Sequence, residues 1–168
     1  MGLTHLFLYR FLIFPLFFAL AAMPATGQTN VAFGGIKADP TLPVEVTADS
    51  LDVNQADGSA EFKGNVRIGQ GEMRISAQRV LVIYNQDQST IQRMEAVGDV
   101  VLVSGPDAAE ADRADYSIDT GVIVMTGNVL LTQGANALSS NNMTVNLTTG
   151  TAQMNGRVRT ILQNDGGN

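Results

Sequence analysis

The sequence contains no cysteine and no tryptophan, and its single histidine lies at position 5. Without cysteine, this chain can form neither a disulfide nor a thiolate nucleophile. Beyond residue 27 it also lacks histidine, the side chain that most often serves as a general base or a metal ligand. These absences argue against an enzyme, against a metal site and against a bound cofactor.

Positive charge is scarce as well. The chain has 10 Lys and Arg residues against 16 Asp and Glu residues. Without residues 1–27, which contain only Arg10 among the charged residues, the net charge is −7 (9 − 16). An acidic balance of this size argues against binding to nucleic acid and against broad contact with an anionic membrane surface.

Residues 1–27 have the pattern of a secretory signal peptide. Arg10 precedes an apolar run over residues 11–22, and a small-residue cleavage site lies just before Gln28, with a rival site after Ala21. The alternative is an uncleaved membrane anchor. The apolar run is short for that purpose, because a span needs about 20 residues.

The part of the chain beyond residue 27 is long enough for one domain with a sizeable core. Residues 28–42 are rich in Gly, Ala, Thr and Asn and predict a flexible lead-in. Residues 43–162 form the expected domain. The polar residues 163–168 predict a disordered tail.

The domain is built from one unit used four times. Each copy has a marker that begins at position 48, 77, 111 or 140, and further along a glycine that is followed by a polar residue and a valine. The spacing of these glycines gives a period of roughly 30 residues, which is typical of a repeat architecture. The glycine motifs begin Gly64-Asn65-Val66, Gly98-Asp99-Val100, Gly127-Asn128-Val129 and Gly156-Arg157-Val158.

Apolar and polar residues alternate within each unit, which predicts half-buried strands. The alternation reverses at every marker. In the first copy, the apolar residues Val44 and Val46 have even sequence positions before the marker, whereas Leu51 and Val53 have odd positions after it. One extra residue reverses the facing of a strand and bends it, so we expect a bulge or corner in each copy. A strand that turns a corner can serve two sheets.

No stretch beyond residue 27 shows helical periodicity, and Val, Ile, Thr and Gly dominate. The sequence therefore predicts an all-β fold of about eight to ten short strands, arranged as four bent antiparallel hairpins in an open, twisted roll. A parallel β-helix that binds polysaccharide is the alternative, since the repeat is long enough for one coil of such a fold. The tight-turn sequences Asp57-Gly58 and Thr149-Gly150 favour hairpins instead.

From periodicity alone, the inward-facing residues predict an ordinary core, whereas the scarcity of bulky side chains and the open ends of the roll favour a groove for lipid chains. Few aromatic residues are present, and methionine, which adapts to irregular partners, recurs on the inner face. An acyl chain gains about 0.8 kcal/mol for each CH₂ group that it buries, so such a site needs no polar motif. The candidate lipid-binding residues are Val44, Val46, Leu51, Val53, Phe62, Val66, Ile68, Val80, Val82, Val100, Leu102, Met125 and Val129.

Arg67 and Arg159 each stand three residues after a repeat glycine. They are candidates for contact with phosphates or sugars at the rim of such a groove. The alternative is that they are solvated charges that discourage aggregation at strand edges. The acidic residues around the markers favour neither a glycosidase pair nor a calcium site, because uncharged residues replace them in other copies.

Three stretches resemble the OstA-like family. They are Pro-Val-Glu-Val-Thr-Ala-Asp-Ser-Leu at residues 43–51, Phe-Lys-Gly-Asn-Val-Arg-Ile-Gly-Gln-Gly at 62–71 and Met-Arg-Ile-Ser-Ala-Gln-Arg-Val at 73–80. Each motif is short. Their order behind a signal peptide is more specific, and the resemblance covers residues 43–162.

The resemblance implies a periplasmic β-jellyroll in a Gram-negative cell. Its channel would hold the acyl chains of lipid A, so that the protein carries lipopolysaccharide for outer-membrane assembly. It also implies head-to-tail stacking of copies through their terminal strands, between an inner-membrane export complex and an outer-membrane translocon. By position, Val44 and Val46 match family residues that touch acyl chains and join the neighbouring protein. A membrane-anchored component of the same system, with residues 6–22 retained, is the alternative function.

Overall fold

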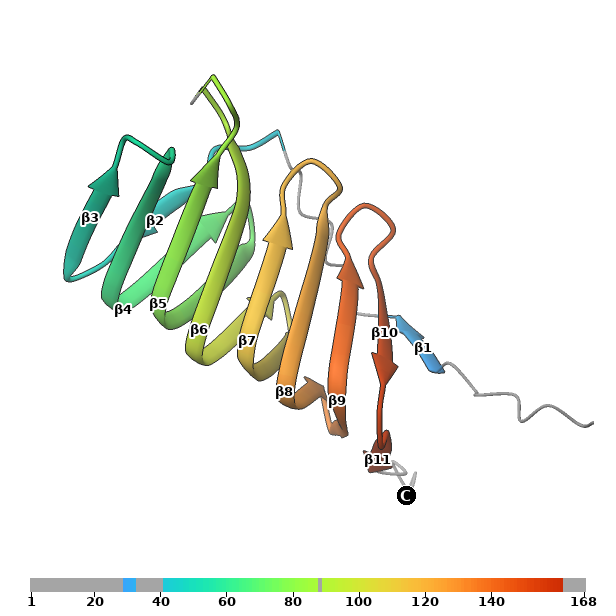
Figure 1. Ribbon diagram of the computed structural model, residues 1–168. Coiled ribbons are helices and arrows are strands. Elements are labelled where there is room, and N and C mark those ends of the chain that lie inside the picture. Colours follow the sequence, from blue (N-terminus) through green and yellow to red (C-terminus); the bar gives the residue numbers. More distant parts are fainter. Residues whose placement is uncertain (1–28, 33–40, 88, 162–168) are drawn as a thin grey trace, which may run out of the picture.

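The computed structural model describes residues 29–32, 41–87 and 89–161, and this part of the chain is all β (Figure 1). It contains no helix, and therefore none that is long and apolar enough to cross a membrane. Six of its strands are longer than the short strands that the sequence predicts, because each continues through a corner. The strands are β1 Thr29–Ala32, β2 Glu45–Thr47, β3 Ser50–Asn54, β4 Ser59–Gln70, β5 Met73–Tyr84, β6 Ile91–Ser104, β7 Asp107–Ser117, β8 Val122–Gln133, β9 Asn136–Asn146, β10 Thr151–Asn155 and β11 Arg159–Ile161.

Every strand pair is antiparallel, which excludes the parallel β-helix. The strands follow one another in the order β1-β10-β9-β8-β7-β6-β5-β4-β2, with β3 also beside β4 and β11 also beside β9. Figure 1 shows the long strands bending so that one limb lies behind the other. The result is the predicted open roll of four bent hairpins.

The bend divides the strands into two layers. The first layer contains β3, β10, β1 and the limbs of the long strands at residues 59–63, 79–84, 91–97, 113–117, 122–126 and 142–146. The second layer contains β2, β11 and the limbs at residues 66–70, 73–77, 100–104, 107–111, 129–133 and 136–140. The pairing register shifts between the two sets of limbs, so the predicted corner exists.

The repeat glycine and the residue after it form the corner. Gly127 and Asn128 both have positive φ values, 80° and 47°, and the equivalent pairs in the other three copies are also left-handed. Asn128 donates a hydrogen bond of 3.0 Å to Asp112 in the preceding marker. Glycine and asparagine tolerate this backbone conformation better than other residues. The corner therefore explains why a glycine and a polar residue recur in this sequence.

Residues 29–32 lie in the segment that the composition predicts to be a flexible lead-in, but they form β1. This strand pairs with β10, where the sheet would otherwise end (Figure 1). Backbone pairing along an unoccupied edge orders a segment whose own sequence has little periodicity. The predicted signal peptide and the predicted tail at 163–168 lie outside the described residues.

A buried hydrogen bond joins the two layers. The hydroxyl of Tyr116 in the first layer donates to Gln70 Oε1 in the second layer at 2.8 Å, and both residues are almost fully buried. Gln70 in turn donates from Nε2 to the carbonyl oxygen of Leu42 at 3.1 Å. Buried polar groups need such partners, because an unpaired one costs about 1–3 kcal/mol. The bond therefore favours the closed arrangement of the layers.

Burial raises the pKa of Tyr116 to about 12. An unfolded tyrosine titrates near pH 10, so the folded state retains the proton of Tyr116 more strongly than the unfolded state. The contribution of this difference to the free energy of unfolding is fully present below about pH 10. We expect the free energy of unfolding to decrease as the pH rises from about 10 to 12. In a Tyr84→Phe variant expressed from Gln28, Tyr116 is the remaining tyrosine. Its tyrosinate absorbance at 295 nm should then show a midpoint near 12, and a midpoint near 10 would contradict the burial.

Candidate functional site

Eight of the candidate lipid-binding residues lie deep between the two layers. Each exposes 2% of its surface or less, and together with other apolar residues they form one continuous core. They are Val66, Ile68, Val80, Val82, Val100, Leu102, Met125 and Val129. In this conformation they contact protein, so contact with a lipid requires the two layers to separate.

Methionine fills much of the space between the layers. Five methionines, Met73, Met94, Met125, Met143 and Met154, are among the largest fully buried side chains. An unbranched, flexible thioether can pack against a lipid chain nearly as well as against its present neighbours. The interior therefore suits a partner of variable shape better than a core of branched side chains would.

The row of inward-facing residues reaches solvent at β3, which has no neighbour on its outer side within the described part of the chain. Leu51 pairs with Phe62, and Val53 pairs with Ala60, so both continue the buried rows of β4. Leu51 is 51% exposed and Val53 is 63% exposed. The inner face thus has an open apolar end at this edge.

A cavity of about 340 Å³ lies at this end. Its apolar lining comes from the small Ala60 and from four larger side chains, Leu51, Val53, Phe62 and Tyr84, and we call these four residues the apolar mouth. The first three are among the candidate lipid-binding residues predicted from the sequence, whereas Tyr84 is not. The signal was available, because Tyr84 has the same parity as Val80 and Val82, which precede it on β5.

Val46 lies on β2 and Val44 just before it, at the same end of the roll as the mouth, because β2 and β3 both pair with β4. Both are half-buried and pack against the core from its edge. Val46 pairs with the buried Ile68, whereas the neighbouring Glu45 is exposed and lines a cavity on the outer face of the second layer. These two valines are therefore inner-face residues that remain partly open to solvent.

The two predicted rim arginines do not lie at the mouth. Arg67 alternates with the buried Val66 and Ile68, so it is on the outer face of the second layer. There it lines a cavity of about 430 Å³ with Arg74. Arg159 is exposed on β11, at the opposite end of that layer. Their contact with a phosphate or sugar stays a prediction.

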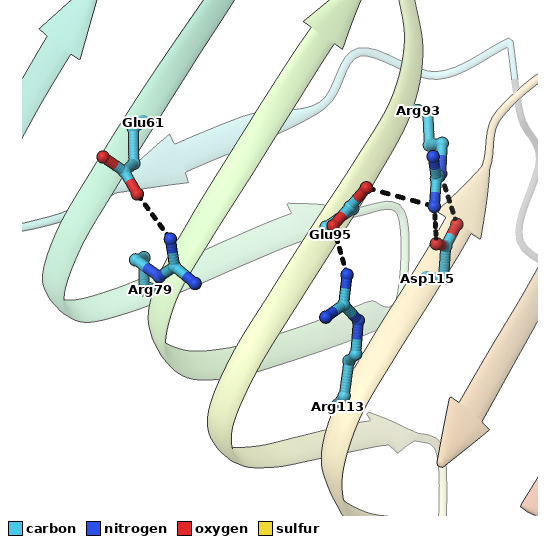
Figure 2. Close-up of polar contacts among 6 residues, drawn as sticks. All are labelled: Glu61, Arg79, Arg93, Glu95, Arg113 and Asp115. Carbon is cyan, nitrogen blue, oxygen red and sulfur yellow. Dashed lines mark hydrogen bonds and ion pairs between the residues drawn. The ribbon is translucent and has the colours of Figure 1, made fainter.

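The outer face of the first layer carries a network of ion pairs (Figure 2). Glu95 contacts both Arg93 and Arg113, and Arg93 also donates to Asp115 at 2.8 Å from Nε. Glu61 accepts from Arg79 at 2.7 Å. Exposed pairs of this kind contribute little to stability. The carboxylates of these pairs do neutralise the arginine side chains on this face.

The same network extends to the edge of the layer. Lys63 lies 2.8 Å from Asp52 and 2.9 Å from Glu61. Hydrogen bonds from Lys63 and Arg79 lower the pKa of Glu61, so this carboxylate stays charged in mildly acidic solution. The marker residue Asp49 instead bonds Asn65 at its corner, at 2.7 Å. These acids thus have structural partners, and within residues 29–32, 41–87 and 89–161 no group of three metal-ligating side chains occurs.

Comparisons with known proteins agree with this arrangement. Residues 45–151 match the family described as LptA/(LptD N-terminal domain) LPS transport protein. An uncharacterized protein of Rhizobium meliloti (strain 1021) is 28% identical over an alignment of 117 residues, and the match covers 65% of this chain and 63% of that relative's length. The crystal structure of LptH from Pseudomonas aeruginosa, the LptA homologous periplasmic component of the conserved lipopolysaccharide transport device, superposes with a TM-score of 0.68 at 16% identity. That match covers 76% of this chain and 99% of LptH. At this identity the likeness shows the fold.

Proposed function

Since the chain belongs to the LptA/LptD N-terminal domain family of lipopolysaccharide transport proteins, we propose that it binds lipopolysaccharide in the periplasm and passes it from the inner membrane toward the outer membrane. The acyl chains of lipid A would lie between the two layers, and the chain would perform no catalysis. The observation that carries this proposal is the apolar inner face, which runs through all four repeats and opens at the apolar mouth.

Burial of acyl chains would offset the cost of opening the layers. An acyl chain with a dozen buried CH₂ groups gains about 10 kcal/mol, since each contributes about 0.8 kcal/mol. Opening the layers opposes this gain, because it exposes core residues and breaks the bond between Tyr116 and Gln70. The methionines can then repack against the lipid. Entry would begin at the mouth, where Leu51 and Val53 are already exposed.

The ends of the roll support end-to-end association. Each repeat consists of one bent strand and one return strand, and the described domain begins with β2–β3 and finishes with β10–β11. In the first layer, seven successive antiparallel pairings lead from β3 to β10, and in the second layer seven lead from β2 to β11. Because seven is odd, β10 is oriented opposite to β3, and β11 is oriented opposite to β2. In a head-to-tail stack, β10 would therefore meet β3 of the next copy in antiparallel orientation, and β11 would meet its β2. Both layers would continue as they do inside one copy.

Such stacking would carry the inner face from one copy to the next. Heterologous contacts of this kind do not close and so produce open filaments. The proposed partners are other copies of the chain, an inner-membrane export complex at one end and an outer-membrane translocon at the other.

Photo-crosslinking tests the lipid site. A photoreactive residue at Val46, irradiated with lipopolysaccharide, should form a covalent adduct that excess lipid A suppresses. The same residue at Glu45, on the outer face of the second layer, is the matched control and should form none. Absence of an adduct at Val46, Val66 and Val100 would mean that these residues are ordinary core and that the protein does not carry lipid.

The second candidate is the membrane-anchored component of the same system. It requires residues 6–22 to remain on the protein, and these residues lie outside the described part of the chain. Sequencing the N-terminus of the protein isolated from cells decides between the two. A mature N-terminus at Gln28 supports the periplasmic bridge, whereas an intact N-terminus supports the anchored component.

A further inference from the structure

Strand β1 occupies the end of the roll at which the next copy would join. It pairs with β10 through four residues, with Thr29 opposite Met154 and Val31 opposite Ala152. In the described part of the chain, β11 has no neighbour on its outer side. Thus β1 covers the first-layer half of this end and leaves the second-layer half open (Figure 1).

The direction of β1 matches that of an incoming strand. Because β1 is antiparallel to β10, and β10 is oriented opposite to β3, β1 has the same direction as β3. Two strands cannot occupy this one place, since neighbouring strands lie about 4.8 Å apart. Either β1 or β3 of the next copy can pair with β10, but not both.

The register of β1 matches as well. Where one repeat meets the next within the chain, the pairing follows a fixed rule. Ala96, two residues before the repeat glycine Gly98, pairs with Ala114, which is two residues after the marker residue Asp112 of the next repeat. By the same rule, Met154 would pair with Leu51 of the next copy, because Met154 precedes Gly156 by two residues.

Ala152 would then pair with Val53 of the next copy. In this structure Thr29 and Val31 occupy those two positions. The segment Thr29–Ala32 therefore reproduces the place, the direction and the register that β3 of another copy would take.

We propose that β1 is an in-chain competitor that limits end-to-end association of copies of this protein. This inference rests on the end-to-end association proposed above. A four-residue strand at a sheet edge is held weakly enough to be displaced, because short edge strands open locally at low cost. Copies that approach in the correct orientation displace β1, whereas weaker contacts do not.

Disulfide trapping tests the position of β1, and the absence of native cysteine makes the background clean. Asn30 is opposite Gln153 on β10. The variant Asn30→Cys/Gln153→Cys, oxidised in dilute solution, should form a disulfide within one chain and remain monomeric. The matched variant Asp52→Cys/Gln153→Cys should form its disulfide between two chains, because repeat equivalence places Asp52 of the next copy opposite Gln153. A disulfide between two chains from the first variant would overturn the proposal.

Weakening β1 tests the competition. Val31→Pro removes a backbone donor and disfavours the strand, and Val31→Thr is the control that keeps a β-branched residue. If β1 covers β10 for at least nine-tenths of the time, Val31→Pro should lower the Kd of self-association at least about tenfold. It should also speed the Asp52→Cys/Gln153→Cys cross-link. Analytical ultracentrifugation measures the Kd.

The outcomes separate this inference from the proposed function. Equal self-association of Val31→Pro, Val31→Thr and the unchanged protein would overturn the competitor role and leave stacking intact. Monomers for all three, with no cross-link through Asp52, would overturn stacking itself and the competition with it. Lipopolysaccharide cross-linking at Val46 reports on the lipid site in either case.

Discussion

Replacing Gly127 by alanine should destabilise the protein by about 3 kcal/mol, because two costs combine at this corner. The backbone has a φ of 80°, which an alanine adopts only at a cost of roughly 1–2 kcal/mol. An added Cβ would also lie 2.9 Å from both Cβ and Cγ of Asp112. Asp112 is short and bonded to Asn128, so it cannot swing away without losing that bond. Urea denaturation followed by circular dichroism measures the loss.

Gly134→Ala is the matched control for this effect. Gly134 also has a left-handed backbone, with a φ of 56°, but no atom lies within 4 Å of the position that a Cβ would take. We expect a loss of about 1 kcal/mol, from the backbone alone. Equal losses for Gly127→Ala and Gly134→Ala would show that the close contact at the corner is unimportant.

Replacing Val53 by aspartate should leave the fold intact and impair lipid binding. Val53 is 63% exposed on an edge strand, so the free energy of unfolding should change by no more than about 0.5 kcal/mol. At the apolar mouth, however, the substitution removes a valine that a lipid chain would cover, worth about 1.5–2 kcal/mol, and it adds a charge that must be desolvated. The Kd for lipopolysaccharide, measured by isothermal titration calorimetry, should rise at least about tenfold.

Leu130→Asp is the control for Val53→Asp. Leu130 is 36% exposed, and it alternates with the buried Val129 and Leu131, so it faces outward from the second layer. It receives the same charge but lies on the opposite face of the layer from the proposed lipid site. The Kd for lipopolysaccharide should stay within about twofold. A similar rise for both variants would indicate a general effect of charge and would contradict entry at the mouth.

The corner could be predicted because it depends on local sequence. The reversal of parity between Val46 and Leu51, and the glycine in each return strand, both follow from a backbone that must bend and change its facing. The side chain at the bend could not be predicted in the same way. The contact between Asp112 and Asn128 joins residues 16 positions apart, and only pairing of the two strands brings them together.

The sites at the ends of the roll were harder to predict. The alternation of apolar and polar residues places Leu51 and Val53 on the inner face, and it places Val80 and Val82 there as well. Leu51 and Val53 are nevertheless exposed, whereas Val80 and Val82 are buried. Parity gives the direction of a side chain but not whether another strand covers it. In the same way, alternation with Val66 and Ile68 places Arg67 on an outer face, but it does not show that the apolar mouth lies elsewhere, at β3.

The amino-acid sequence was enough to establish the all-β class, the four repeats, the bend in each repeat and the set of inward-facing residues. Each of these depends on the alternation of side chains and on backbone preferences within a few residues. The folded structure was needed to show that the inner face is buried through the middle of the roll and exposed at the apolar mouth, that Tyr116 bonds Gln70 across the layers, and that β1 covers β10. These features depend on which edges and faces meet after folding, and pairing between distant backbone segments leaves little trace in local periodicity.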